Sequence, residues 1–326
     1  MKAIVQSRYG SADVLEYTDV QKPVVRDDEV LVRVRAASIG AWVTHVIEGD
    51  PLIMRLAFGL RRPKPIRSSD FAGEVVDVGK QVREFRAGDE VYGEADAVFA
   101  EYATAKPAAI SQKPHSLSFE EAAAVPIAGQ TALLGIRDVG SVQPGQRVLI
   151  IGAAGGVGTF AVQIARLLGA DVTAVCGTSG LELVSSLGAD NVIDYTSEDF
   201  PEQSTTYDLI YQGAGSHSIS ELRDALTESG TLVLSSGEGG RWFGPLGRLA
   251  QALALSPLLR QDLRTFVAKP DVDNLRHLTE LIEGGRIITV IDRIYPLAEM
   301  AEAVRHFQHG HVHGKTVVTI PKAPHP

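Results

Sequence analysis

The segment that most constrains the fold of this chain is residues 147–158, with the sequence RVLIIGAAGGVG. Its first five residues are typical of a buried strand, and the glycines that follow allow a tight turn into a helix. Such a turn lets a pyrophosphate approach the amides at the helix N-terminus, where peptide dipoles favour negative charge. Ala153 stands at the first glycine of the G-x-G-x-x-G pattern, and Gly155 and Gly158 hold the other two places. The segment predicts a dinucleotide-binding turn, the alternative being a turn that only packs a helix on a strand.

The residues after the turn complete a βαβ unit. Apolar residues at helical spacing continue to Leu168, Gly169 ends the helix, and residues 172–176 form the next strand. The sequence Leu-Gly-Ala-Asp recurs at 168–171 and 187–190, each time before a strand, and its glycine suits a left-handed helix end. Further strands are predicted at 207–211 and 231–235, with a helix around 219–226 between them. The alternation predicts a parallel sheet of at least five strands.

The first third of the chain has β character instead. Alternating or β-branched apolar residues predict an antiparallel, barrel-like domain with strands at 30–37, 73–78, 89–92 and 99–105. A capping box, Ser118-x-x-Glu121, then opens an alanine-rich helix. After Pro270 a helix to about Gly284, a strand near 287–291, a helix through Phe307 and a strand at 316–320 break the alternation. We expect this C-terminal part to return to the first domain.

Composition bounds the class of partner and the compartment. The 326 residues carry a net charge of −9, which disfavours nonspecific attraction to nucleic acid or an anionic membrane, so a small molecule is the expected partner. Cys176 is the single cysteine and excludes an intrachain disulfide, and the first residues show no apolar h-region. No apolar stretch reaches the roughly eighteen residues of a bilayer span. These features favour a cytoplasmic enzyme without an integral membrane segment.

Five motifs in this order resemble those of the medium-chain dehydrogenase/reductase superfamily: residues 73–79, 88–93, 123–132, the glycine turn, and 310–315. Among its branches the chain looks most like the zinc-independent quinone oxidoreductases of the zeta-crystallin type and the related enoyl reductases. The resemblance implies an α/β fold, with a GroES-like antiparallel β-barrel domain and a Rossmann doubly wound parallel sheet. It implies a GroES-like substrate domain over 1–118, a Rossmann NADPH-binding domain over 119–268, and a return to the substrate domain over 269–326.

A zinc site of the alcohol dehydrogenase kind is not expected. That site needs two cysteines and a histidine, and the chain has one cysteine. Where the zinc branch carries Gly-His-Glu, this sequence has Ser68, Ser69 and Asp70. The histidines near the C-terminus invite a metal interpretation, but a polar turn between helix and strand explains them better. They are His306, His309, His311 and His313.

The tip of the second strand of the nucleotide fold predicts the cofactor. An NAD site places Asp or Glu about 20 residues beyond the turn, where it binds the ribose and repels a 2′-phosphate. Here the strand ends in Gly177, Thr178 and Ser179, with no acid at its tip, and those hydroxyls and nearby amides could hydrogen-bond a phosphate. NADPH is therefore expected, with NADH used less well. By the resemblance, Tyr195 would also lie by the phosphate.

The resemblance implies the rest of the cofactor site. Thr131 would face the nicotinamide, and residues at the ends of two later strands would border the cofactor: Gln212, Gly213, Ser235, Ser236 and Gly237. The turn itself would supply Ala154, Gly155, Gly156, Val157 and Gly158. Ordinary loop chemistry is the alternative for each of these serines and glycines.

Without a metal to polarise a carbonyl, the substrate must already be electrophilic, as a quinone or an alkene conjugated to a carbonyl is. Relatives commonly carry Asn-Pro-x-Asp after the second strand, but residues 38–44 read SIGAWVT, so both polar side chains are lost. Trp42, Tyr92 and Thr131 are the candidate catalytic residues, as pocket wall or hydrogen-bond donor, with packing as the alternative. Asp70 is expected to form structural hydrogen bonds rather than act in catalysis.

Two apolar stretches, 51–60 and 241–246, either enclose a hydrophobic substrate, form a homodimer contact or lie at a membrane surface. Two functions remain open from sequence. The first is a zinc-independent, NADPH-dependent quinone or enone reductase. The second is a catalytically weak NADPH-binding redox sensor or interaction protein.

Overall fold

The computed structural model describes residues 1–60, 63, 69–198, 205–215, 217–235, 260–310 and 312–321. The chain forms two compact units, one of residues 1–130 with 269–326 and the other of residues 131–268. The compact unit that contains the N-terminus extends to Gln130, whereas the sequence predicts that the nucleotide domain begins at residue 119. That domain boundary stays a prediction. We call the units the N-terminal unit and the nucleotide unit.

The nucleotide unit is built on a six-stranded sheet in the order β10-β9-β8-β11-β12-β13, and every pairing is parallel. The strands are β8 (Arg147–Ile151), β9 (Asp171–Cys176), β10 (Asn191–Asp194), β11 (Tyr207–Gln212), β12 (Leu226–Leu234) and β13 (Asp262–Thr265). The helices described with them are α5 (Gly156–Leu167), α6 (Leu181–Ser186) and α7 (Ile219–Asp224), with a π-helical turn over Leu134–Val139 and a 3-10 turn over Thr178–Gly180. This sheet confirms the predicted Rossmann fold.

Local sequence explains the ends of these elements. Gly169 and Gly188 follow α5 and α6 with φ of 82° and 100°, as the repeated Leu-Gly-Ala-Asp sequence predicts. The predicted helix at 219–226 is shorter, because α7 ends at Asp224 and Leu226 already begins β12. Within β8, residues Val148, Leu149 and Ile150 are fully buried, as expected of a strand covered on both faces.

The N-terminal unit holds a seven-stranded sheet whose main path is β14-β15-β3-β4-β5-β7, with β6 also paired to β3. Its strands are β3 (Val30–Ile39), β4 (Ser69–Val78), β5 (Glu90–Ala95), β6 (Tyr102–Ala105), β7 (Ile110–Gln112), β14 (Ile291–Pro296) and β15 (Lys315–Thr319). All pairs are antiparallel except β14 with β15. A separate hairpin joins β1 (Lys2–Gln6) to β2 (Leu15–Asp19).

The helices of this unit are α1 (Ala41–Glu48), α2 (Met54–Phe58), α3 (Phe119–Ala123), α4 (Pro126–Leu133), α9 (Val272–Glu283) and α10 (Met300–Gln308), α4 continuing across the boundary between the units. Short 3-10 turns lie at Ala12–Val14, Pro107–Ala109 and Leu297–Glu299. The capping box at the start of α3 is confirmed. The Ser118 amide donates to the Glu121 carboxylate at 2.8 Å, and the Glu121 amide donates to the Ser118 hydroxyl at 3.1 Å.

One strand was predicted in the wrong place. The apolar run 287–291 suggested a strand, but β14 begins at Ile291 and continues to Pro296. Only Ile287 of that run is buried as a core residue, whereas Ile288 is 57% exposed, so the run does not present one face to a core.

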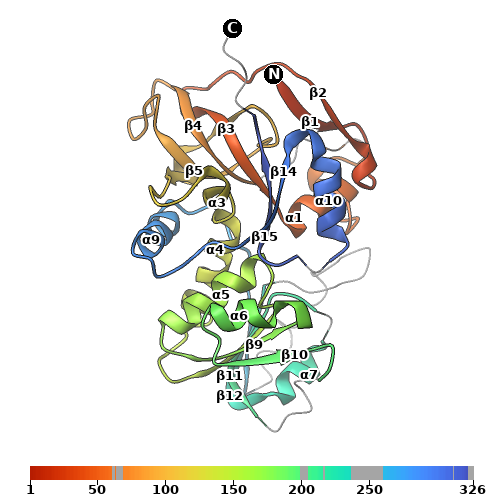
Figure 1. Cartoon of the computed structure of the whole chain (residues 1–326), viewed down its shortest axis with the longest axis vertical. Coiled ribbons are helices and arrows are strands. Elements are labelled where there is room, and N and C mark those ends of the chain that lie inside the picture. The colour runs from red at the N-terminus through yellow and green to blue at the C-terminus, as the bar shows by residue number, and fades with distance from the viewer. Residues whose placement is uncertain are drawn as a thin grey trace. The chain divides into compact units, whose positions relative to one another are not determined.

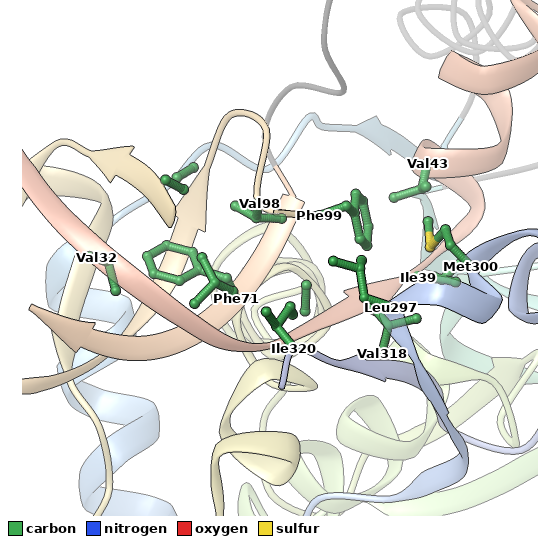
Figure 2. Close-up of a cluster of buried hydrophobic side chains, with 14 of the residues drawn as sticks. Val32, Ile39, Val43, Phe71, Val98, Phe99, Leu297, Met300, Val318 and Ile320 are labelled. Atoms are coloured by element: carbon green, nitrogen blue, oxygen red, sulfur yellow. The ribbon is translucent and has the colours of Figure 1, made fainter. Parts of the chain in front are cut away.

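The core of the N-terminal unit joins the two ends of the chain. Figure 2 shows Phe71 and Phe99 from the first hundred residues in one cluster with Leu297, Met300 and Val318. In Figure 1, β15 and α10, drawn in blue, lie beside the orange and red strands of the same unit. Burial of side chains of this size contributes about 1.5–3 kcal/mol each. The C-terminal segment is thus part of the hydrophobic core that β3 and β4 build.

Across the described residues, no helix is both long enough and apolar enough to cross a membrane.

Candidate functional site

The glycine turn between β8 and α5 is shaped by close backbone approach. Gly152 has a φ of 81°, a left-handed conformation that disfavours residues with a side chain. A Cβ at Gly158 would overlap the carbonyl oxygen of Gly152 and backbone atoms of Ala153. Gly155 has an ordinary extended φ of −76° and leads directly into the helix. The turn therefore requires glycine at 152 and 158 for its own shape, whereas at 155 a side chain is allowed by the backbone.

The N-terminus of α5 presents backbone amides beyond this turn. The first bond within the helix is donated by the Thr159 amide to the Gly155 carbonyl at 2.9 Å. The amides of Gly156, Val157 and Gly158 come before it, at the positive end of a helix of 12 residues. An anion such as a pyrophosphate is stabilised at such a position. The structure thus gives the predicted turn the geometry of a dinucleotide-binding loop.

The ends of the neighbouring strands meet at the same edge. In register, Asp194 lies beside Cys176, Val175 beside Ile151, and Gln212 beside both Ile151 and Leu234. After β8 the chain adds β9 and β10 on one side and then crosses to β11 on the other. Ligands of open α/β sheets bind where the strand order reverses in this way, outside the carboxyl ends of the strands.

The tip of β9 lies close to the glycine turn. A Cβ at Gly180 would lie 2.8 Å from the Ala154 Cβ, so the turn after β9 packs directly on the glycine turn. A Cβ at Gly177 would lie 3.3 Å from the Tyr195 hydroxyl, and Tyr195 is 58% exposed. The structure therefore places Ala154 against Gly180 and Tyr195 against Gly177, and their role in holding a cofactor stays a prediction.

Some of the predicted cofactor residues at the ends of β11 and β12 form hydrogen bonds within the protein. The Gln212 side chain is fully buried and its amide donates to the Gly215 carbonyl at 3.2 Å. The Ser235 hydroxyl donates to the Gln212 carbonyl at 3.2 Å. Gly213 continues the sheet edge, since its amide donates to the Ile151 carbonyl. Ser236, Gly237 and the apolar stretch 241–246 lie outside the described residues.

No acid follows β9 in the chain, as expected, but the folded sheet brings one beside its tip. Asp194, the last residue of the adjacent strand β10, accepts a hydrogen bond from the Thr178 hydroxyl at 2.6 Å. The Thr196 hydroxyl and amide donate to its other oxygen at 2.7 and 2.9 Å. The hydrogen bonds from Thr178 and Thr196 lower the pKa of Asp194. The signal in the sequence was the Asp before Tyr195, but only the pairing of β10 with β9 shows which residue it faces.

In the N-terminal unit, Asp70 is a structural residue, as the sequence analysis favoured. It is 2% exposed and accepts hydrogen bonds from the Ser38 hydroxyl at 2.7 Å and from the Lys315 ammonium at 2.9 Å. Its other oxygen accepts from the Ile127 amide at 2.7 Å, at the start of α4. We call these four residues the Asp70 cluster. The cluster ties β3, β4 and β15 to the N-terminus of α4.

Tyr92 packs rather than facing a pocket. It is fully buried on β5, and its hydroxyl donates to the Leu275 carbonyl at 2.7 Å and contacts the Thr279 hydroxyl at 2.9 Å. Burial raises the pKa of Tyr92. These contacts anchor α9 to the sheet and favour packing, one of the two alternatives for this residue.

The other two catalytic candidates are more accessible. Trp42 is 39% exposed on α1, and its ring meets Phe58 edge to face at a centroid distance of 5.4 Å. Thr131 is half-buried on α4. The preceding residue, Gln130, donates to the Glu94 carboxylate at 3.1 Å and accepts from the Asp271 amide at 2.9 Å. Gln130 therefore holds the middle of α4 against β5 and the start of α9, directly beside Thr131.

The C-terminal histidines form ordinary hydrogen bonds. His306 pairs with Asp292 at 2.6 Å, His309 contacts the Arg305 carbonyl, and the His313 amide donates to the other oxygen of Asp292. His311 lies outside the described residues. Among the residues that are described, no three His, Cys, Asp or Glu side chains gather as metal ligands would. The contacts favour a polar turn, and the metal content of the protein stays a prediction.

Comparison with known proteins agrees with this geometry. The family models Alcohol dehydrogenase GroES-like domain and Zinc-binding dehydrogenase match residues 26–126 and 187–318. The Chloroplast envelope quinone oxidoreductase homolog of Arabidopsis thaliana is 31% identical over 98% of each chain. The mitochondrial NAD(P)H oxidoreductase RTN4IP1 of Mus musculus is 30% identical, over 98% of this chain and 89% of its own. The solved quinone oxidoreductase of Coxiella burnetii is 29% identical with a TM-score of 0.85, covering 98% of this chain and 99% of that one.

The chain therefore belongs to the medium-chain dehydrogenase/reductase superfamily, in its quinone oxidoreductase-like branch.

Proposed function

We propose that this protein is an NAD(P)H-dependent oxidoreductase that passes a hydride to a quinone or an α,β-unsaturated carbonyl. The observation that carries the proposal is the turn at Gly152–Gly158, which leads into the amide-bearing N-terminus of α5 at the edge where the strand order reverses. The names of two relatives, a quinone oxidoreductase homolog and an NAD(P)H oxidoreductase, support the same class of reaction.

The residues of the nucleotide unit would hold the cofactor in parts. The amides of Gly156, Val157 and Gly158 would bind the pyrophosphate, and Gly177 with Tyr195 would flank the adenosine ribose. When bound, a reduced nicotinamide supplies a hydride. Thr131, half-buried on α4, is our candidate for the side chain that faces the nicotinamide. The Asp70 cluster fixes the N-terminus of α4 within the N-terminal unit.

The donor set of the chain favours a substrate that needs no metal. With Cys176 as its one cysteine, the chain cannot supply the two cysteines and histidine of zinc alcohol dehydrogenases. Ser69 stands where that branch has its histidine, and the neighbouring Asp70 is already bound by Lys315 and Ser38. A conjugated alkene or a quinone accepts hydride without Lewis-acid activation. Trp42, exposed on α1, is our candidate for the wall of a pocket for such a hydrophobic electrophile.

The cofactor preference depends on the residues around the tip of β9. A preference for NADPH was expected because no carboxylate follows β9, but Asp194 of β10 lies beside that tip and accepts the hydrogen bond of the Thr178 hydroxyl. Tyr195 remains available beside Gly177. We propose that the protein uses both NADPH and NADH, with NADPH favoured by less than the roughly tenfold to hundredfold that one full hydrogen bond to the phosphate would provide.

A second candidate is a catalytically weak NADPH-binding redox sensor or interaction protein. The contacts of Tyr92 favour this second function, because the hydroxyl of this candidate donor is already hydrogen-bonded to Leu275 and Thr279. Turnover separates the two functions. With NADPH and a simple quinone or enone, the reductase should turn over at the rate of about 1 s⁻¹ or faster that is typical of enzymes.

The decisive assay uses the full chain after exhaustive chelation, with elemental analysis for zinc. The proposal expects no stoichiometric zinc and unchanged turnover of quinone or enone with NADPH. One tightly held zinc per chain whose removal abolishes turnover contradicts the metal-free mechanism. Tight NADPH binding with no turnover on either class of substrate favours the sensor.

The compartment and assembly remain proposals as well. We propose a cytoplasmic location and a homodimer, although two relatives are named as chloroplast envelope and mitochondrial proteins. Fractionation of the source cells and the mass of the purified protein in solution test these two expectations.

A further inference from the structure

We propose that Asp194 sets the cofactor preference of this protein by penalising the 2′-phosphate of NADPH. The inference rests on the proposed function, because it concerns the same cofactor site. Asp194 ends β10 beside Cys176, the last residue of β9, so its carboxylate lies at the strand tip where the adenosine ribose would bind. The carboxylate of Asp194 would thus lie near the ribose although Asp194 belongs to β10 and not to β9.

The hydrogen-bond donors of Thr178 and Thr196 at this tip already bond to Asp194. The Thr178 hydroxyl carries one proton, and it donates that proton to Asp194 at 2.6 Å. The Thr196 hydroxyl and amide also donate to Asp194. A phosphate therefore cannot accept the proton of Thr178 unless the bond to Asp194 breaks. The side chain that looks like a phosphate ligand in the sequence is instead a ligand of the carboxylate.

The negative charge of Asp194 also disfavours binding of the 2′-phosphate. Asp194 has no basic partner among its described contacts, and the sequence holds no Lys or Arg between Arg166 and Arg223. A phosphate oxygen within hydrogen-bond reach of Thr178 would lie about 4–5 Å from the Asp194 carboxylate. In water a dianion at that distance is disfavoured by about tenfold in binding constant at low salt and about fivefold at physiological ionic strength. NADH, which has no 2′-phosphate, escapes this penalty.

The test compares NADPH and NADH binding to the parent and to Asp194→Asn, by calorimetry at about 0.01 M and 0.15 M salt. Asn removes the charge and keeps one oxygen, which can accept from Thr178 or from Thr196 but not from both. The ratio of the NADH Kd to the NADPH Kd should rise about tenfold at low salt and about fivefold at the higher salt. Asp194→Ser serves as a second uncharged variant in case the amide disturbs the loop.

Asp171→Asn is the matched control, because Asp171 is an exposed acid at the other end of β9. The six residues of β9 place it about 17 Å from the tip, beyond the screening length of about 8 Å at 0.15 M salt, so at that salt its ratio should equal that of the parent. A ratio that is unchanged in both Asp194 variants overturns the inference while leaving the cofactor site in place. Failure of the parent to bind either dinucleotide overturns the proposed function instead.

Discussion

The glycine turn of the nucleotide unit and the Asp70 cluster of the N-terminal unit are both polar sites, but backbone groups form the first and side chains form the second. The turn is built from backbone, with Gly158 against the Gly152 carbonyl and amides facing outward at the start of α5. The Asp70 cluster is built from side chains, with a carboxylate that is 2% exposed and bonded to Ser38, Lys315 and the start of α4. The first is formed by one continuous segment, and the second needs four.

The two polar sites respond to substitution differently. In the turn, a side chain is excluded by shape, so the cost of a substitution depends on which atoms it overlaps. In the Asp70 cluster, the cost comes from leaving a charge buried without its partner. We propose that the turn binds a ligand and that the cluster positions the start of α4, and each of the following variants tests one of the two regions.

The largest effect on stability is expected from Lys315→Met. The variant leaves Asp70 buried next to an apolar side chain, and breaking a buried pair of this kind costs about 3–5 kcal/mol of unfolding free energy. Chemical denaturation monitored in the N-terminal unit measures it. Lys2→Met is the control, because the Lys2–Asp19 pair is exposed and worth about 0–1 kcal/mol. Equal effects of the two variants would show that the cluster is not the anchor we describe.

A smaller loss of stability is expected from Gly158→Ala. The added Cβ overlaps the Gly152 carbonyl, and overpacking of this kind costs about 1–3 kcal/mol. Gly155→Ala is the matched control, because its Cβ would lie 3.3 Å from the same carbonyl and its φ of −76° suits any residue. Thermal unfolding should separate the two variants by several degrees. If both melt together, close backbone approach at 158 does not shape the turn.

The smallest signal is expected from Cys176, which tests whether the edge of the nucleotide sheet carries a reactive side chain. Burial, with a smaller contribution from the charge of Asp194, raises the pKa of this thiol to about 11. Its thiolate form is therefore rare at neutral pH and its alkylation slow, and the rate should increase as the pH rises toward 11. Labelling with iodoacetamide at pH 8, followed by mass spectrometry, should leave the folded protein nearly unmodified while the unfolded chain reacts. Rapid labelling of the folded protein contradicts the structure at this tip.

Sequence predicted what continuous segments build. The turn, the capping box at Ser118 and the helix ends at Gly169 and Gly188 each depend on residues within a few positions of one another, and the Rossmann class follows from their succession along the chain. The partners that structure added come from distant segments. Asp194 faces Thr178 only because β10 pairs in register with β9, and that register is set by the folded sheet.

The same reason explains the other partners that the sequence did not identify. The sequence left Tyr92 open between a pocket role and packing, because the partner of its hydroxyl, Leu275, lies 183 residues further along the chain. Asp70 was expected to form structural hydrogen bonds, but its partner Lys315 is 245 residues away and no local pattern identifies it. Strand β14 was misplaced because the apolar run 287–291 resembles a strand, while the buried face is decided by pairing with β15.

The central claim is that the turn before α5 binds a reduced nicotinamide dinucleotide, and Gly156→Val tests it most directly. Gly156 is the first residue of α5, so a branched side chain there would obstruct the pyrophosphate while leaving β8 and its neighbours in place. By calorimetry the parent should bind NADPH and NADH, and the variant should lose at least about a hundredfold in affinity for both, which corresponds to about 2.7 kcal/mol. Its melting temperature should stay within a few degrees of the parent. A folded Gly156→Val protein that binds NADPH as tightly as the parent would contradict the account.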